Sequence, residues 1–154
     1  MKKLLVFLAL ASALSFAWAD DKKTYDESAN AAEQIQAAQK AAKAAGKSTL
    51  VVFGANWCGD CKMLDLEMHQ GELAKLVNDR LVVVKVDVGR FDRNKEVTGR
   101  YGNIVKKGIP SVVLLRADGS VAYQTDGGEL ADARKMGREG VTKFFGTMLA
   151  KASS

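Results

Sequence analysis

The sequence has few of the residues that build disulfide frameworks or metal cages. Its 154 residues include two cysteines, one histidine and one proline. Both cysteines, Cys58 and Cys61, lie in one short stretch, so none remains for another disulfide. A structural zinc site needs four ligands, and the only histidine, His69, follows Cys61 by eight residues. We therefore predict no metal site, a solvated His69 at a helix end, and a domain stabilised by its hydrophobic core. A copper-carrier role for these three side chains stays open, although nothing in the sequence favours it.

An excess of charge is also missing. The chain has 23 basic and 18 acidic residues, and two of the lysines, Lys2 and Lys3, precede an apolar run at the start of the chain. Without those two lysines the net charge is +3, from 21 basic and 18 acidic residues. This excess is too small to indicate nucleic-acid binding, and no basic run is interleaved with aromatic residues. Repeats and low-complexity linkers are absent too, apart from an alanine-rich segment.

One long apolar run is present, over residues 4–16, and Ala17-Trp18-Ala19 follows it. A basic start, an apolar run and small residues before a polar segment predict a signal peptide over residues 1–19, cleaved after Ala19. A membrane anchor is the alternative, but the run is shorter than the roughly 20 residues that a spanning helix needs. We expect export, with the bacterial periplasm as the compartment, and no stable membrane insertion after cleavage. Residues 20–154 then have the size of a single domain.

Hydrophobic periodicity and turn signals predict alternating helices and strands. Helices are expected over residues 26–45, 62–68, 72–78, 94–101 and 141–150, and strands over residues 48–53, 81–88, 111–115 and 121–125. Thr24, Asp26 or Ser28 is expected to cap the first helix, and Gly46 to end it. The order predicts a three-layer α/β domain with a mixed sheet.

The two cysteines stand between a predicted strand and a predicted helix, separated by Gly59 and Asp60. Two thiols at this spacing can close a small disulfide ring and reopen it. The free N–H groups and the positive dipole at a helix start stabilise a thiolate and lower its pKa. We interpret Cys58, at a junction expected to be exposed, as the attacking thiolate, and Cys61 as the thiol that resolves a mixed disulfide.

The segment Trp57-Cys58-Gly59-Asp60-Cys61-Lys62 resembles the thioredoxin superfamily, whose best-known motif reads Trp-Cys-Gly-Pro-Cys-Lys. Gly108-Ile109-Pro110-Ser111 resembles the family's second signature, in which the proline follows a cis peptide bond. The resemblance extends over residues 24–145 and implies a thioredoxin-like three-layer fold, with a central mixed β-sheet flanked by helices.

The resemblance also assigns expected roles to three residues beside the cysteines. Trp57 matches the tryptophan that shields the thiol and contacts substrate, although packing in the core is its alternative. Ile109 and Pro110 are expected against the disulfide, where the Ile109 backbone pairs with a bound peptide as an added strand. The loop before Gly108 is longer than in ordinary thioredoxins, so we expect it to bear on partner choice.

Two departures from the family pattern concern the cysteine pair. Asp60 replaces the family proline, and its carboxylate disfavours a thiolate at Cys58 while the helix start favours both charges. Val52 stands where thioredoxins have a buried aspartate, although Lys85 matches the lysine that partners this aspartate. We expect Gly59, Asp60 and Lys85 to modulate the pair. Without an aspartate at position 52, the proton of Cys61 is left to water, to Lys85 or to a carboxylate at another position.

Charged residues in two loops are interpreted as solvated. One set is Lys106 and Lys107, for which the selection of acidic partners is the alternative, and the other is Arg90, Asp92 and Arg93. Neither set enters the predicted site.

The predicted function is that of an exported thiol–disulfide oxidoreductase, a protein-disulfide reductant and monomer. It needs no bound cofactor, because the pair of Cys58 and Cys61 is itself the redox centre. Its expected partners are protein thiols and disulfides together with a membrane or soluble electron donor or acceptor. The alternative is a non-enzymatic binding or chaperone-like module that uses the same groove and keeps the disulfide as a local staple.

Overall fold

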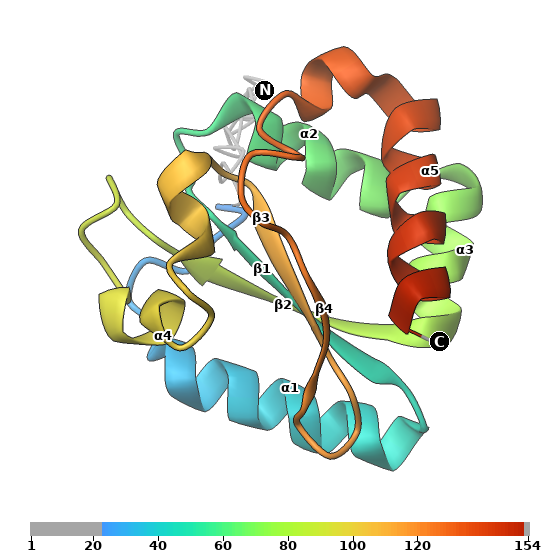
Figure 1. Ribbon diagram of the computed structural model, residues 1–154, viewed down its shortest axis with the longest axis horizontal. Coiled ribbons are helices and arrows are strands. Elements are labelled where there is room, and N and C mark those ends of the chain that lie inside the picture. Colours follow the sequence, from blue (N-terminus) through green and yellow to red (C-terminus); the bar gives the residue numbers. More distant parts are fainter. Residues whose placement is uncertain (1–22, 153–154) are drawn as a thin grey trace, which may run out of the picture.

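The computed structural model describes residues 23–152, which form a four-stranded sheet with helices on both faces (Figure 1). In chain order the elements are α1 (Ala31–Ala45), β1 (Ser48–Gly54), α2 (Gly59–Met68), α3 (Gly71–Arg80), β2 (Leu81–Asp87), α4 (Lys95–Gly99), the 3₁₀ helix η1 (Ile104–Lys107), β3 (Ser111–Leu115), β4 (Val121–Gln124) and α5 (Ala133–Ala152). The predicted leader, residues 1–19, lies outside the described residues.

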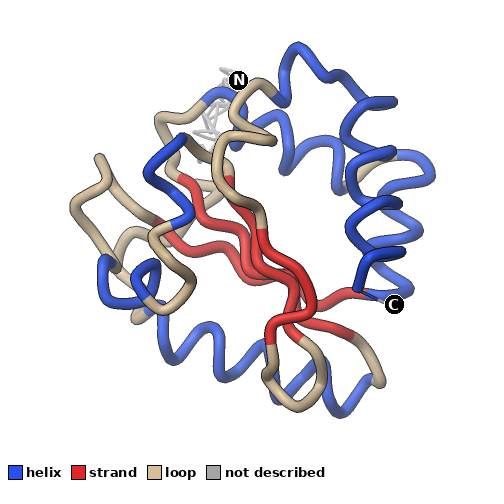
Figure 2. Tube along the Cα trace, in the orientation of Figure 1, coloured by secondary structure: helices blue, strands red, loops and turns tan. Residues whose placement is uncertain are grey.

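The sheet, red in Figure 2, is mixed, as the sequence predicts. Its strand order is β2-β1-β3-β4, in which β1 is parallel to β2 and antiparallel to β3, and β3 is antiparallel to β4. Strand β1 is therefore central, with Val52 beside Lys85 of β2 on one edge and beside Val112 of β3 on the other. The disulfide motif follows directly from the end of this central strand.

Alternating side chains of β1 divide the core into two layers. Leu50 and Val52 pack with apolar residues of α2, α3 and α5, whereas Val51 and Phe53 pack with residues of α1 and α4. Figure 1 shows α1 and α4 on one side of the sheet and the other three α-helices opposite. A strand that is covered on both faces needs apolar residues at every position, which explains the unbroken run Leu50 to Phe53. The three-layer prediction is confirmed.

The first helix begins later than predicted. Asn30 caps it, because the Asn30 side chain accepts hydrogen bonds from the backbone N–H groups of Ala32 and Glu33. The predicted caps were wrong: Asp26 instead bonds the hydroxyl and the backbone N–H of Ser28 in a turn of its own. The predicted end is confirmed, since Gly46 adopts the left-handed conformation that closes a helix.

Other helix boundaries also differ from the prediction. Helix α2 begins at Gly59 rather than at residue 62, because Cys58 itself is the N-cap. Helix α3 has ten residues, and α5 begins at Ala133 rather than at residue 141. A break at Gly137, with φ of 61°, separates the first turn of α5 from the amphipathic part that the sequence predicts. This extra turn carries Arg134, which contacts Asp60 between the two cysteines.

No helix among residues 23–152 combines the length and the apolar character needed to cross a bilayer.

Candidate active site

Cys58 and Cys61 form a disulfide at the first turn of α2. The Cys58 backbone is extended, which is the usual conformation of an N-cap, and its sulfur accepts a hydrogen bond of 3.1 Å from the Cys61 N–H. Cys58 therefore lies at the N-cap of α2, just after the central strand, and Cys61 lies in the first turn of the helix, close enough to form the disulfide. A thiolate formed at Cys58 on reduction would keep this N–H as a donor.

The two sulfurs are more covered than the sequence indicates. Only 5% of Cys58 and none of Cys61 is exposed, so the expectation of an exposed Cys58 was wrong. The Ile109 carbonyl oxygen lies 3.6 Å from the Cys58 sulfur, and the peptide bond from Ile109 to Pro110 is cis, as the family resemblance implies. The Ile-Pro loop therefore contributes to the cover over the disulfide, and Cys58 remains the more accessible of the two residues.

Trp57 lies on the surface and not in the core. Half of this residue is exposed, and its indole N–H donates a 2.8 Å hydrogen bond to the Gly89 carbonyl. Phe91, which is 44% exposed, meets the Trp57 ring edge-on at 6.0 Å between ring centroids, and the Arg90 guanidinium lies 5.9 Å from the Trp57 ring centroid. Phe91 has a φ of 65°, an unfavourable conformation for a bulky side chain. Sequence reasoning did not single out Phe91.

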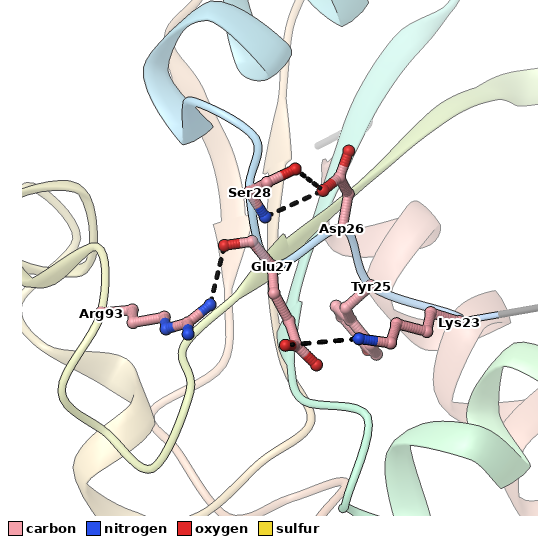
Figure 3. Close-up of a pocket in the computed structure, with 6 residues that line it drawn as sticks. All are labelled: Lys23, Tyr25, Asp26, Glu27, Ser28 and Arg93. Atoms are coloured by element: carbon pink, nitrogen blue, oxygen red, sulfur yellow. Dashed lines mark hydrogen bonds and ion pairs between the residues drawn. The ribbon is translucent and has the colours of Figure 1, made fainter.

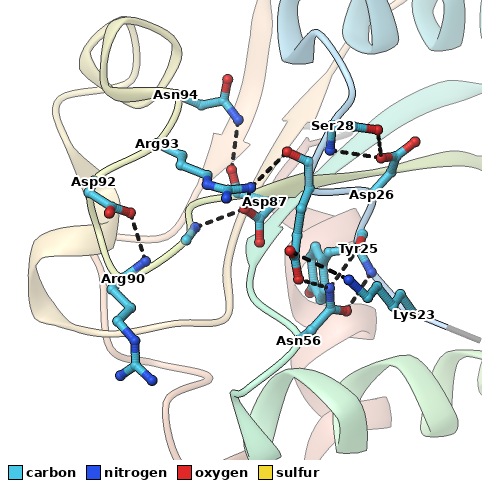
Figure 4. A network of polar contacts seen from close by, with 12 residues as sticks. Lys23, Tyr25, Asp26, Ser28, Asn56, Asp87, Arg90, Asp92, Arg93 and Asn94 are labelled. Carbon is cyan, nitrogen blue, oxygen red and sulfur yellow. Dashed lines mark hydrogen bonds and ion pairs between the residues drawn. The ribbon is translucent and has the colours of Figure 1, made fainter. Parts of the chain in front are cut away.

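The loop that carries Phe91 is held by a polar network (Figure 4). Asn94 donates to the Asp87 carbonyl at 2.7 Å, and Arg93 donates to the Glu27 carbonyl at the same distance. The Asp92 carboxylate accepts from the Arg90 N–H at 2.9 Å. The charged residues in this loop are exposed, as predicted, but they also fix the loop against which Trp57 packs. Lys106 and Lys107 are likewise exposed, as predicted.

The same network anchors the segment that precedes α1. The Asn56 side chain accepts from the Tyr25 N–H at 2.9 Å and donates to the Tyr25 carbonyl at 2.8 Å. These bonds seat the buried Tyr25 ring beside the start of the active-site loop. A surface pocket lies over this segment, lined by Lys23, Tyr25, Asp26, Glu27, Ser28 and Arg93 (Figure 3).

Asp60, between the cysteines, is paired with Arg134 of α5. Its carboxylate accepts from the Arg134 backbone N–H at 3.0 Å and from two guanidinium nitrogens at 3.2 Å and 3.1 Å. The guanidinium hydrogen bond, above all, lowers the pKa of Asp60, and burial opposes it. A Cβ added at Gly59 would stand only 3.1 Å from the guanidinium, so this glycine admits the arginine. Sequence reasoning missed Arg134, because the partner lies 74 residues away.

Lys85 has a carboxylate partner despite the missing aspartate at position 52. Val52 is buried among apolar side chains, and the Lys85 ammonium forms an ion pair with Asp65, one turn after Cys61 on α2. His69 ends this helix with a 68% exposed side chain, as predicted, and its ring nitrogen bonds the Asp65 carbonyl at 2.6 Å.

Among residues 23–152 there is no group of three or more side chains suited to hold a metal ion.

A family model described as thioredoxin-like matches residues 30–117. The chain belongs to this family. The match covers the cysteine pair, the Ile-Pro loop and the central strands, and it stops before Arg134.

Similar proteins agree with this assignment. The chain is 38% identical to a thioredoxin of Bacillus subtilis over 78 residues, which is 51% of this chain and 66% of the relative. It is 39% identical to Thioredoxin-1 of Drosophila yakuba over 70 residues, 46% of this chain and 58% of the relative. The chain thus spans somewhat less than two thirds of these relatives. A crystal structure of a disulphide isomerase from Xylella fastidiosa Temecula1 is 47% identical, with a TM-score of 0.78, and the match covers 82% of this chain and 96% of that one.

Fold, disulfide and family together define the site as that of a thioredoxin-like protein-disulfide oxidoreductase. The chemistry available to it is thiol–disulfide exchange, for which the cysteine pair supplies the two electrons. Thioredoxins need no further cofactor, and the roles of Trp57, Ile109 and Pro110 in substrate contact remain predictions that their positions around Cys58 suit.

Proposed function

We propose that this protein is an exported reductant of protein disulfides. The observation that carries the proposal is the arrangement around Cys58: a disulfide at the start of α2, covered by the Ile109 carbonyl on one side and flanked by the exposed Trp57 on the other. A partner that docks on this surface presents its own disulfide to the Cys58 sulfur, which is otherwise hardly accessible from solvent.

The reaction proceeds in two exchanges. The reduced Cys58 thiolate attacks one sulfur of the partner disulfide, which forms a mixed disulfide and releases the other partner sulfur as a thiolate that takes a proton. Cys61 loses its proton and attacks the Cys58 sulfur, so the mixed disulfide breaks and the Cys58–Cys61 bond forms. The partner gains two electrons and this protein loses two.

The reducing direction follows from weak stabilisation of the Cys58 thiolate. A pair is strongly oxidising when its reduced form is strongly stabilised. Here the Cys58 sulfur accepts one backbone N–H, while the Ile109 carbonyl oxygen at 3.6 Å opposes a negative charge. The nearby Arg134 guanidinium is engaged by Asp60, so its positive charge is largely compensated. These contacts favour a reductant over an oxidant.

The docking surface proposed for partner proteins consists of Trp57, Phe91, Ile109 and Pro110. Trp57 and Phe91 together expose an aromatic surface beside Cys58, and the Ile109 backbone is available to pair with an extended segment of the partner. The partners are protein thiols and disulfides. A membrane or soluble thiol donor returns electrons to the oxidised pair, and we propose that the protein acts as a monomer.

Export is proposed from the leader pattern of residues 1–19. Its test is fractionation of cells that express the full chain, followed by N-terminal sequencing of the product. A chain that begins at Asp20 in the extracytoplasmic fraction supports the proposal, and a full-length cytoplasmic product overturns it.

The reduction potential of the Cys58–Cys61 pair tests the direction. The protein is equilibrated with glutathione or dithiothreitol redox buffers, and the reduced fraction is counted by thiol alkylation. A value near about −270 mV supports a reductant, and a value near about −120 mV would mark an oxidant instead. A pair that never equilibrates would favour the non-enzymatic module with a structural disulfide.

A further inference from the structure

Helix α2 carries a charge pair, Asp65 with Lys85, that has no role in the exchange reaction described above. Asp65 follows Cys61 by four residues, so the two side chains lie on the same side of the helix, with their Cβ atoms about 5–6 Å apart. Lys85 of β2 forms an ion pair with the Asp65 carboxylate. Both side chains are largely withdrawn from solvent, with exposed fractions of 22% for Asp65 and 24% for Lys85.

Tyr25 extends this arrangement to the Cys61 sulfur. A Cβ added at Gly54 would collide with the Tyr25 hydroxyl and would stand 3.0 Å from the Cys61 sulfur, so the hydroxyl and the sulfur border the same small space. Burial, and then the negative charges of Asp65 and Asp87, raise the pKa of Tyr25. The hydroxyl therefore keeps its proton at neutral pH and lies within the electrostatic reach of the Asp65 carboxylate.

We infer that Asp65, held by Lys85, accepts the proton of the Cys61 thiol through the Tyr25 hydroxyl. Tyr25 transfers its own proton to the carboxylate and receives the Cys61 proton, which leaves a thiolate at Cys61, a neutral carboxyl at Asp65 and an unchanged Tyr25. The thiolate then attacks the Cys58 sulfur of the mixed disulfide, and the partner thiolate leaves. The proton on Asp65 returns to solvent, from which the departing partner thiolate is protonated.

In this arrangement Asp65 takes the place of the carboxylate that is missing at position 52. Lys85 lies beside Val52 in the β1–β2 pairing, and its partner is supplied by α2 rather than by β1. The charged or titratable groups in contact with the carboxylate are Lys85 from β2 and His69 from α2, and its charge also acts on Tyr25 from the segment before α1. The ion pair with Lys85 holds in place the carboxylate that accepts the proton.

The inference rests on exchange chemistry at Cys58 and Cys61, but not on its direction or compartment. Its test is stopped-flow reaction of the reduced protein with Ellman's disulfide, which releases one coloured thiolate when Cys58 attacks and a second when Cys61 resolves. The variants are Asp65→Asn, Tyr25→Phe and, as matched control, Asp79→Asn at an exposed position of α3.

We expect Asp65→Asn and Tyr25→Phe to slow the second release by about tenfold or more at pH 7, and to leave the first release and the control unchanged. The second release should recover at high pH, where hydroxide deprotonates Cys61 directly. Lys85→Met should also slow the second release, because Asp65 loses the ammonium that holds its carboxylate in place.

A second release with wild-type rate and pH dependence in Asp65→Asn would overturn the inference. Slowing in Asp65→Asn without slowing in Tyr25→Phe would overturn the transfer through the hydroxyl. If Asp65→Asn does not fold, as judged by its circular dichroism, Tyr25→Phe and Lys85→Met carry the test. Failure of the first release in the wild-type protein would instead contradict the exchange chemistry itself.

Discussion

The two ends of the disulfide lie in different surroundings, although three residues separate them in sequence. Cys58 faces outward, toward the docking surface, and its neighbour Asp60 is paired with the largely exposed Arg134. Cys61 faces inward, toward Tyr25 and the half-buried pair of Asp65 and Lys85. The Arg134 side chain is 63% exposed, whereas Lys85 and Asp65 are each less than a quarter exposed. The outer end is thus arranged for access and the inner end for proton transfer.

Replacement of each sulfur should separate the two ends most completely. Cys58→Ser should abolish turnover of a protein disulfide, because no other thiol can make the first attack. Cys61→Ser should keep the first attack and accumulate mixed disulfides with partner proteins, because nothing resolves them. Non-reducing electrophoresis and single-turnover assays measure both effects. Full turnover in both variants would show that the disulfide is only a staple.

Loss of Arg134 should raise the pKa of the Cys58 thiol. In Arg134→Met the Asp60 charge is left uncompensated beside Cys58, so we expect a rise on the order of one pKa unit and an attack about threefold slower at pH 7, because the scarcer thiolate is also more nucleophilic. The thiolate absorbance measured against pH gives this value. The double variant Asp60→Asn with Arg134→Met removes both charges and should restore the thiol pKa. An unchanged pKa in the single variant would mean that Asp60 does not influence Cys58.

Truncation of Phe91 should affect large substrates alone. In Phe91→Ala, Trp57 loses the ring that meets its edge, and we expect kcat/KM for a protein disulfide to fall a few-fold, since an aromatic pair contributes about 0.5–1.5 kcal/mol. The rate with a small disulfide should not change. Val121→Ala is the control, because Val121 is similarly exposed but lies on β4. Equal losses for both substrate sizes would place the effect on the disulfide rather than on docking.

The smallest expected effect is the pH dependence of the Asp60–Arg134 pair. The pKa of Asp60 is lowered from 3.8 in the folded protein, so the carboxylate stabilises the fold above this pH and loses its contribution as the pH falls through the lowered value. The free energy of unfolding of Asp60→Asn should therefore be slightly lower than that of the wild type at pH 7, and the difference should vanish in acid. Denaturant unfolding at several pH values measures it. A difference that persists at pH 2 would assign the effect to something other than this charge.

The sequence predicts well what depends on neighbouring residues. The apolar runs of β1 and β3 and the place of the cysteine motif between a strand and a helix follow from local patterns, and the Ile-Pro loop follows from the family resemblance. The start of α1 was misplaced because Asp26 and Ser28 have the composition of caps but bond each other, which leaves the cap to Asn30. Local competition among several capping residues is decided by backbone geometry, which the pattern does not contain.

Contacts between distant segments were the part that the sequence did not reveal. Arg134 reaches Asp60 only because Gly137 breaks α5 and the preceding turn lies over the start of α2. Tyr25 reaches the active-site loop through Asn56, across 31 residues. Asp65 did carry a signal, since it follows Cys61 by one helical turn, but its pairing with Lys85 appears only once β2 lies beside β1.

Alkylation of the reduced protein tests the account's central claim most directly. A limiting amount of iodoacetamide is added at pH 7 and the labelled cysteine is located by peptide mass spectrometry. The account predicts that Cys58 is labelled first and that Cys61 stays free, because the Cys58 sulfur is the more accessible and accepts the helix N–H. Preferential labelling of Cys61, or equal labelling of both, would contradict the assignment of Cys58 as the attacking thiolate.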